Sequence, residues 1–154
     1  MKKSNIPILY GVYVAIGLIA YFLLLSLFGL HKYPAFSVLN MLITGAGMFL
    51  AIKKFRAEKG AKFKYQKGFM VSLVTGFTAT IIFTAFFAIY TTELNPGFKE
   101  ELITMWETDY FVPIGMLVFT VALMGFATTF VLSLTFMQLL KDSWNTKDAA
   151  KHTY

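Results

Sequence analysis

Long hydrophobic runs separated by short polar breaks dominate the pattern along the chain. Four of these runs contain no charged residue, and we expect them to be transmembrane helices: residues 6–30, 36–52, 68–90 and 113–140. A helix rises about 1.5 Å per residue, so about 20 residues cross a hydrocarbon core of roughly 30 Å. The second run has only about 17 residues, which is near the lower limit for crossing.

The composition supports an all-α membrane protein. The 154 residues are 57% hydrophobic and only 14% charged, with a mean hydropathy of +0.64. Soluble domains carry about 25% charged residues, and a chain of this length could not hide so much apolar surface in one core. We therefore expect one four-helix membrane domain spanning residues 1–154. The first run is much longer than the apolar part of a cleaved signal peptide, so we expect it to be retained.

The distribution of positive charge predicts the orientation. Of the 14 Lys and Arg residues, only Lys32 and Lys99 lie on the side that carries the first and third connections, which leaves 12 on the other side. Short loops rich in Lys and Arg stay in the cytoplasm. Both termini and the second connection are therefore expected to be cytoplasmic, in a multi-pass protein of the cell inner membrane.

The second connection is strongly basic. It is expected to contact the headgroups of the anionic inner leaflet, at about 1 kcal/mol per basic residue near the surface. The alternative is contact with an acidic or phosphorylated partner, whereas a loop held between two spans has little freedom to wrap a nucleic acid. The basic residues are Lys53, Lys54, Arg56, Lys59, Lys62, Lys64 and Lys67.

The third connection is predicted to contain a short amphipathic helix. Asn95 followed by Pro96 resembles an N-cap and a first helical position. Apolar residues then recur at helical spacing, among them Phe98, Leu102 and Trp106. We expect this helix to lie on the outer leaflet with its apolar face down. A lid or a partner-binding surface is the alternative.

Small residues occupy every fourth position of the third span. Such spacing lets membrane helices approach closely, either within the bundle or in a homo-oligomer. The residues expected to pack in this way are Gly68, Ser72, Gly76, Thr80, Thr84 and Ala88. Gly125, Thr129 and Ser133 form a shorter stripe of the same kind in the fourth span.

No Asp, Glu, Lys, Arg or His lies within a predicted span. Ion-coupled transporters and proton relays usually need one. His31 and His152 are expected on opposite sides of the membrane, so they cannot form a dyad or a shared metal site. The chain also has no cysteine, no metalloprotease motif and no phosphate-binding loop. We therefore expect no enzyme activity, no cofactor and no metal.

Residues 60–69, GAKFKYQKGF, lead into the Ser/Thr/Gly-rich third span. With Asn95-Pro96 and Glu100 after that span, they resemble a family of small four-helix bacterial inner-membrane proteins labelled as a domain of unknown function. Phe63 and Lys67-Gly68 match the family pattern, whereas Lys62 stands where the family has a small polar residue. The resemblance implies the fold and the membrane location, and no site.

Two functions are consistent with these features. The first is a non-catalytic accessory or scaffold protein that binds membrane lipids or an unknown membrane-protein partner. The alternative is an oligomeric channel or carrier for a small solute. A water-accessible cavity lined by Asn40, Thr44, Thr75 or Thr128 would favour the alternative, whereas a dry core would count against it.

Overall fold

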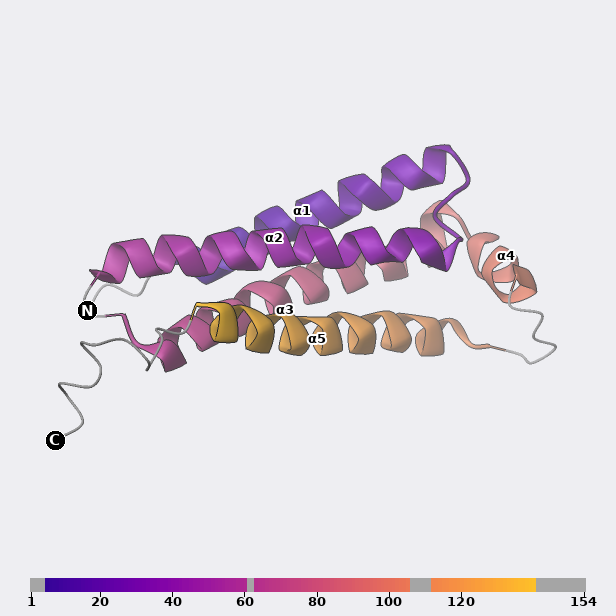
Figure 1. Ribbon diagram of the computed structural model, residues 1–154. Coiled ribbons are helices and arrows are strands. Elements are labelled where there is room, and N and C mark those ends of the chain that lie inside the picture. Colours follow the sequence, from indigo (N-terminus) through magenta and orange to yellow (C-terminus); the bar gives the residue numbers. More distant parts are fainter. Residues whose placement is uncertain (1–4, 61–62, 106–111, 141–154) are drawn as a thin grey trace, which may run out of the picture.

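A computed structural model describes residues 5–60, 63–105 and 112–140 of the chain. The helices of this part are α1 (Ile6–Leu27), α2 (Pro34–Lys59), α3 (Tyr65–Ile89), the π-helical turn η2 (Tyr90–Leu94), α4 (Phe98–Met105) and α5 (Ile114–Leu139). Figure 1 shows the four long helices side by side, with the short α4 beyond one end of the bundle. We call that end the α4 end, and the opposite end, where α2 stops and α3 starts, the basic end.

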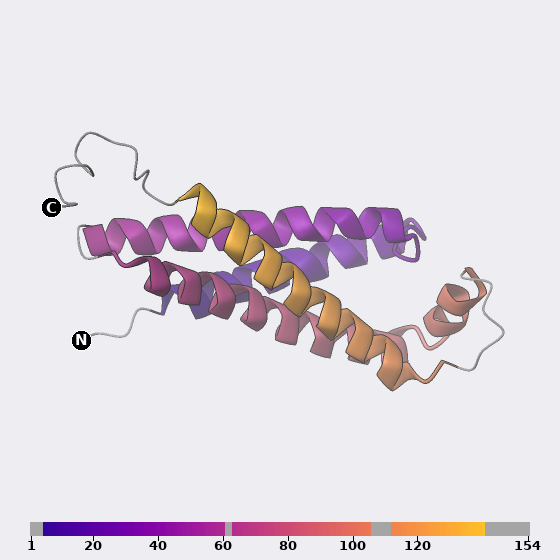
Figure 2. The same ribbon diagram turned by 60° about the horizontal axis from the view of Figure 1, so that its bottom comes forward.

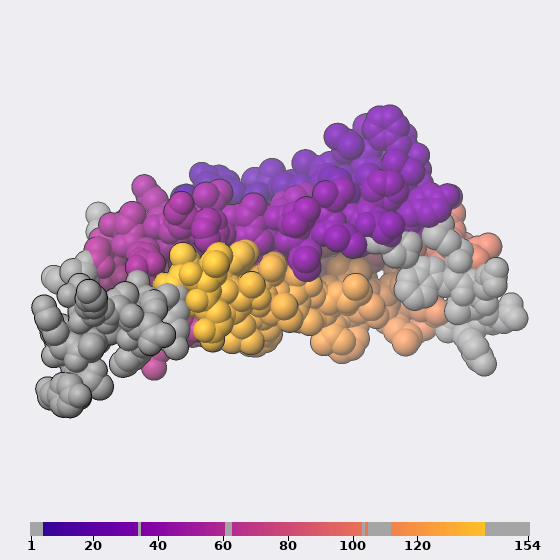
Figure 3. Space-filling model, in the orientation of Figure 1, coloured from indigo at the N-terminus to yellow at the C-terminus, as the bar shows by residue number. Residues whose placement is uncertain are grey.

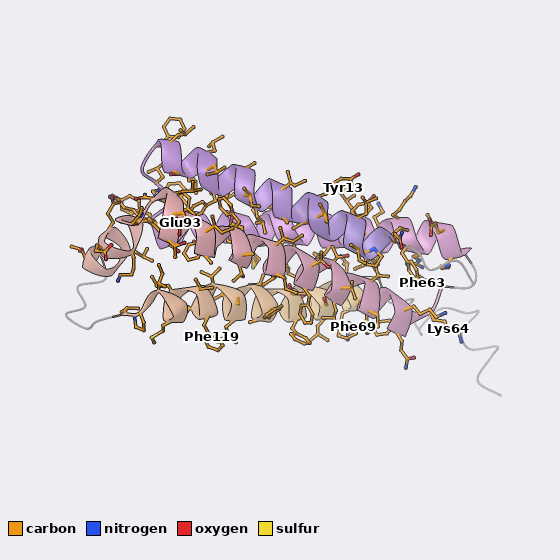
Figure 4. All side chains as sticks on the ribbon, turned by 180° about the vertical axis from the view of Figure 1, so that it is seen from behind. Tyr13, Phe63, Lys64, Phe69, Glu93 and Phe119 are labelled. Carbon is orange, nitrogen blue, oxygen red and sulfur yellow. The ribbon has the colours of Figure 1, made fainter. Side chains whose placement is uncertain are left out.

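The four long helices are each long and apolar enough to cross a membrane. Large apolar side chains cover much of the outside of the bundle, including Ile16, Ile81 and Val131, each about 60% exposed. Figure 4 shows Phe119 pointing away from the bundle on α5. An apolar exterior of this kind is suited to lipid, so the prediction of an all-helical fold with four membrane-crossing helices is confirmed.

The second helix corrects one prediction. The expected span 36–52 had little margin, but α2 runs from Pro34 to Lys59 and has 26 residues. Charge ends the apolar run at Lys53 but does not end the helix, because Lys and Arg are good helix formers. The helix stops at Gly60, whose φ of +50° suits glycine.

The other long helices lie close to the predicted spans. α1 ends at Leu27, three residues before the predicted end, and α5 begins and ends within one residue of its predicted limits. α3 begins at Tyr65, three residues early, so that Lys67 lies in the helix. η2 then continues the helical path to Leu94.

α3 and α5 pack through interlocking small residues. The hydroxyls of Ser72 and Ser133 share a buried hydrogen bond of 2.8 Å. A Cβ added at Gly125 would lie 2.6 Å from Cγ2 of Thr80. The pairs run in opposite directions along the two helices in steps of four residues, and we call them the α3–α5 ladder: Gly68/Met137, Ser72/Ser133, Gly76/Thr129 and Thr80/Gly125.

α1 packs against α3 and α2 through similarly close contacts. Gly11 of α1 lies so near α3 that an added Cβ would be 2.8 Å from the carbonyl oxygen of Thr75. Gly47 of α2 receives the side chain of Val14. Glycine at these two positions is required because any side chain would separate the helices.

α5 touches α2 at the basic end. There Phe49 and Phe136 pack with ring centroids 5.6 Å apart, and Arg56 Nη1 donates to the carbonyl oxygen of Leu140 at 3.4 Å. Toward the α4 end α5 diverges from α2, as Figure 2 shows. The bundle is therefore tightly packed in its basic half and open between α2 and α5 in its other half.

Candidate functional site

A cavity of about 570 Å³ lies in the half of the bundle nearer the α4 end. Residues of α1, α2, α3 and α5 line it, and Phe98 and Leu102 of α4 lie at its mouth. Figure 3 shows the face on which α2 and α5 meet along a seam. Because these two helices diverge toward the α4 end, the cavity lies directly inside this seam.

The α3–α5 ladder forms the floor of the cavity. Thr80 and Gly125, its last pair, both line the cavity, whereas the three pairs beyond them do not. Thr44 of α2 and Thr128 of α5 also line it. Thr44 lies ten residues into α2, about 15 Å along the helix, so the cavity reaches about halfway through a bilayer.

Apolar side chains make up most of the wall. Leu18 and Phe22 contribute from α1, Phe83 from α3, and Leu117 and Val121 from α5. Pockets for small molecules combine such walls with a few well-placed polar groups.

Uncharged polar side chains from three helices face this cavity. Its lining includes Ser37, Asn40 and Thr44 of α2, Thr80 and Thr84 of α3, and Thr120 and Thr128 of α5. Asn40 Oδ1 and Thr84 Oγ1 are shielded from solvent and have no hydrogen-bond partner among the described residues. A buried polar atom without a partner is costly, so a ligand that forms hydrogen bonds with these two atoms would remove that cost.

The threonines differ in how their hydroxyls are used. Thr75, Thr129 and Thr135 donate to the carbonyl four residues earlier in their own helix, as helical threonines commonly do. The hydroxyl of Thr84 makes no such bond, although the same carbonyl geometry is available in α3. Its hydroxyl therefore keeps its hydrogen-bonding capacity toward the cavity side of α3.

An aromatic cluster closes the mouth of the cavity. The ring of Phe22 meets Tyr90 edge to face, with centroids 4.9 Å apart. Phe98 stacks on His31. The Tyr90 hydroxyl lies 2.7 Å from Ser26 Oγ and 3.3 Å from His31 Nε2. These contacts join α1, the turn after it, η2 and α4.

His31 is the titratable group of this cluster. Burial lowers the pKa of His31 from its ordinary value of 6.5, Glu101 opposes this shift, and Lys32 adds to it. Lys32 itself pairs with Glu101 at 3.4 Å, which ties the turn after α1 to α4. The mouth thus combines a neutral imidazole with a compensated pair of charges.

The basic residues that were predicted to contact lipid headgroups gather at the basic end. Lys53 and Lys54 are exposed on the last turns of α2, and Lys64 and Lys67 are exposed at the start of α3. Lys53, Arg56 and Lys59 each lie over an aromatic ring, at 5.5, 5.5 and 5.6 Å from the ring centres. Figure 4 shows Phe63 and Lys64 at this end. Lys62 lies outside the described residues.

Five of the six residues expected to pack in the third span lie in the α3–α5 ladder or in the cavity lining, and Ala88 lies in neither. Gly68, Ser72, Gly76 and Thr80 lie in the α3–α5 ladder. Thr80 and Thr84 line the cavity, so the stripe passes from a helix contact to a ligand-accessible wall. The sequence reasoning assigned Thr80 and Thr84 to packing and missed this role.

The short helix of the third connection begins later than expected. α4 starts at Phe98, whose backbone N–H donates to the carbonyl of Asn95, so Pro96 lies in a turn and not in the first helical turn. Phe98 is only 2% exposed and packs in the aromatic cluster. The expectation that Phe98 faces the leaflet is therefore wrong, since the turn at Asn95 directs it into the bundle. Leu102 packs beside it, and Trp106 lies outside the described residues.

One signal in the sequence could have located the cavity. Ser37, Asn40 and Thr44 are spaced by three and four residues, so they share one face of α2. The carrier hypothesis named Asn40, Thr44 and Thr128 singly, and all three line the cavity. Thr75 does not, because it is buried at the close approach of α1.

The comparisons with known proteins identify a family and nothing closer. No curated protein matches the chain. No solved structure matches it either. The profile of the family described as "Protein of unknown function (DUF4199)" matches residues 9–110, from within α1 through α4. This confirms the resemblance to a family of unknown function, and the chain belongs to the DUF4199 family.

Proposed function

We propose that this protein is a non-catalytic membrane protein that binds an amphipathic, lipid-like ligand in the cavity between α2, α3 and α5. The observation that carries the proposal is the cavity itself, about 570 Å³ in volume, with apolar walls and unpartnered polar atoms at Asn40 and Thr84. A membrane-borne molecule can match both kinds of surface at once. Its apolar part packs on the walls, and its polar part meets the side chains that lack partners.

The divergence of α5 from α2 supports entry from the bilayer. Met41 of α2 and Met124 of α5 both line the cavity and are both exposed on the outside of the bundle. A ligand dissolved in the membrane would pass between these flexible side chains without crossing the aromatic mouth. This route makes the protein an accessory that holds or presents a lipid, as the first of the two sequence-based functions supposes.

The proposal includes an orientation. With the basic end in the cytoplasm, both termini are cytoplasmic and the cavity opens in the outer half of a cell inner membrane. The exposed lysines Lys53, Lys54, Lys64 and Lys67 then lie at the anionic inner leaflet. Two different lipid contacts result, one by charge at the inner surface and one by shape in the outer half.

Blocking the seam tests the binding function. Met124→Trp places a large ring where α2 and α5 diverge, and we expect it to reduce the lipid-like molecules retained by the purified protein several-fold. Leu134→Trp is the matched control, because Leu134 is exposed on the same helix but does not line the cavity. Native mass spectrometry after extraction in mild detergent measures the retained molecules. Equal retention by both variants would contradict the proposal.

A small-solute carrier is the second candidate. The uncharged polar lining formed by Asn40, Thr44 and Thr128 favours it. A transport path would also have to open the α3–α5 ladder, whose Ser72–Ser133 bond lies between the cavity and the basic end. Reconstituted protein should then accelerate entry of a neutral solute such as glycerol into liposomes. A protein that binds lipid but gives no such flux is an accessory and not a carrier.

Binding to a protein partner would show in the same preparation. An accessory protein can also act as a scaffold. In that case a second membrane protein, or a second copy of this chain, should remain bound to it in mild detergent. The mass of the purified particle distinguishes these cases. A monomer that retains a lipid and no protein supports lipid binding and rejects the scaffold.

A further inference from the structure

We infer that the ligand of this cavity is an uncharged amphiphile that carries hydroxyl groups, and not an anionic or cationic lipid. This inference rests on the proposed function and specifies its ligand. It is argued from the polar atoms that lack partners, from the absence of charge around them, and from their depth.

The two unpartnered oxygens, Asn40 Oδ1 and Thr84 Oγ1, are best matched by a ligand that donates hydrogen bonds. Asn40 Oδ1 can only accept, so a ligand that pairs with it must donate a hydrogen bond. Thr84 Oγ1 can donate and accept. A ligand hydroxyl is the simplest group that serves both atoms, because it too donates and accepts. Ester and ketone oxygens alone cannot satisfy Asn40 Oδ1.

The described cavity lining offers no unpaired charge to a charged ligand. Among the described residues that line the cavity, Lys32 alone carries a full charge, and it pairs with Glu101 at the mouth. Below the mouth the lining is apolar or carries hydroxyl and amide groups. A carboxylate or phosphate placed there would lose its hydration without gaining an opposite charge, which is expensive at membrane depth.

The polar groups also lie deep. Asn40 is six residues into α2, about 9 Å along the helix, and Thr44 is one turn deeper. A charged headgroup stays at the membrane surface, whereas an uncharged hydroxyl can follow its hydrocarbon part inward at much lower cost. The depth of Asn40 and Thr84 therefore favours an amphiphile whose polar part is small and neutral.

Three probes with the same hydrocarbon chain test the inference: 1-monooleoylglycerol, methyl oleate and oleate. The first has hydroxyl donors, the second has an ester without a donor, and the third is anionic. Native mass spectrometry titrations of the full chain give the dissociation constants. We expect 1-monooleoylglycerol to bind at least about threefold to tenfold more tightly than the other two, as the gain of one or two hydrogen bonds implies.

Matched variants place the effect at the named atoms. Thr84→Val removes the hydroxyl at nearly constant shape, and Thr84→Ser keeps it. Thr84→Val should weaken the binding of 1-monooleoylglycerol about threefold to tenfold and leave the binding of methyl oleate unchanged. Thr84→Ser should bind 1-monooleoylglycerol as tightly as the parent protein does. Thr135→Val is the control, because the Thr135 hydroxyl donates to Val131 outside the cavity.

The outcomes distinguish a failure of the inference about the ligand from a failure of the proposed lipid-binding function. If oleate binds as tightly as 1-monooleoylglycerol, or Thr84→Val changes nothing, the inference is overturned and lipid binding itself stands. If none of the three probes binds, the inference and the proposed function both fall. Selective loss of 1-monooleoylglycerol binding in Thr84→Val, with Thr84→Ser and Thr135→Val unchanged, supports both.

Discussion

The imidazole of His31 lies flat on the ring of Phe98, with centroids 4.5 Å apart and ring planes inclined by 18°. This stack joins the turn after α1 to the first residue of α4, and it lies at the mouth of the cavity. Burial in this place lowers the pKa of His31 from 6.5, so the folded protein favours the neutral ring. The cost of burying a charged imidazole therefore outweighs the attraction that Glu101 of α4 would exert on it.

The first prediction concerns pH. The pKa of His31 is lower in the folded than in the unfolded protein, so its contribution to stability is complete above pH 6.5 and decreases as pH falls toward the folded-state pKa. We expect the Tm in detergent to fall between pH 7.5 and pH 5.5. His31→Gln should show a smaller fall over the same range. Parallel pH profiles for the two proteins would refute a role for His31.

The second prediction concerns the floor of the cavity. Gly125→Ala adds a Cβ 2.6 Å from Thr80, so the two helices must separate, and overpacking of this kind costs about 1–3 kcal/mol. The control is Gly115→Ala, because an added Cβ at Gly115 meets nothing within 4 Å. Thermal unfolding in detergent should show a loss for Gly125→Ala and no loss for Gly115→Ala. Equal effects would mean that α3 and α5 are less closely packed than described.

The third prediction concerns the buried hydrogen bond of the ladder. Ser72→Ala and Ser133→Ala should each destabilise the protein, and the double variant should lose less than the sum. A coupling energy of about 0.6 kcal/mol is usual for such bonds within membranes. Reversible unfolding in mixed detergent micelles gives the four stabilities of the cycle. Strict additivity would show that the two hydroxyls do not interact.

The fourth prediction concerns orientation. The chain contains no cysteine, so single cysteines report accessibility without background. Tyr33→Cys lies in the turn after α1, and Lys64→Cys precedes α3 at the basic end; both positions are exposed. In intact cells a membrane-impermeant thiol reagent should label Tyr33→Cys and not Lys64→Cys. Labelling of both positions, or of Lys64→Cys alone, would reject a cytoplasmic basic end.

The helices were predictable because their cause is local. An uninterrupted apolar run is sufficient to indicate a membrane-crossing helix, and all four runs correspond to long helices. Their ends were less predictable. α2 passes through Lys53 and continues to Lys59, since a charge stops membrane insertion without stopping helical hydrogen bonding.

The site depended on contacts between distant parts of the chain. The small residue spacing of the third span was evident, but which members meet α5 depends on the register of the two helices. That register brings Thr80 to Gly125 and places Thr84 in the lining of the cavity. The buried position of Phe98 could not be predicted either, because its ring packs on side chains distant in the sequence, among them His31, 67 residues earlier in the chain.

The four-residue spacing of the α3–α5 ladder also restricts how α5 can slide along α3. Sliding α5 by one residue in one direction would bring Phe130 opposite Gly76 and Ile81 opposite Gly125, where the helices lie too close for side chains of that size. On the basic side of Gly125, the ladder therefore opposes this displacement of α5 along α3. Because the ladder ends at the Thr80–Gly125 pair, the part of α5 from Ile114 to Met124 lies outside it, and this part borders the cavity without the close contacts that hold the rest of α5 to α3.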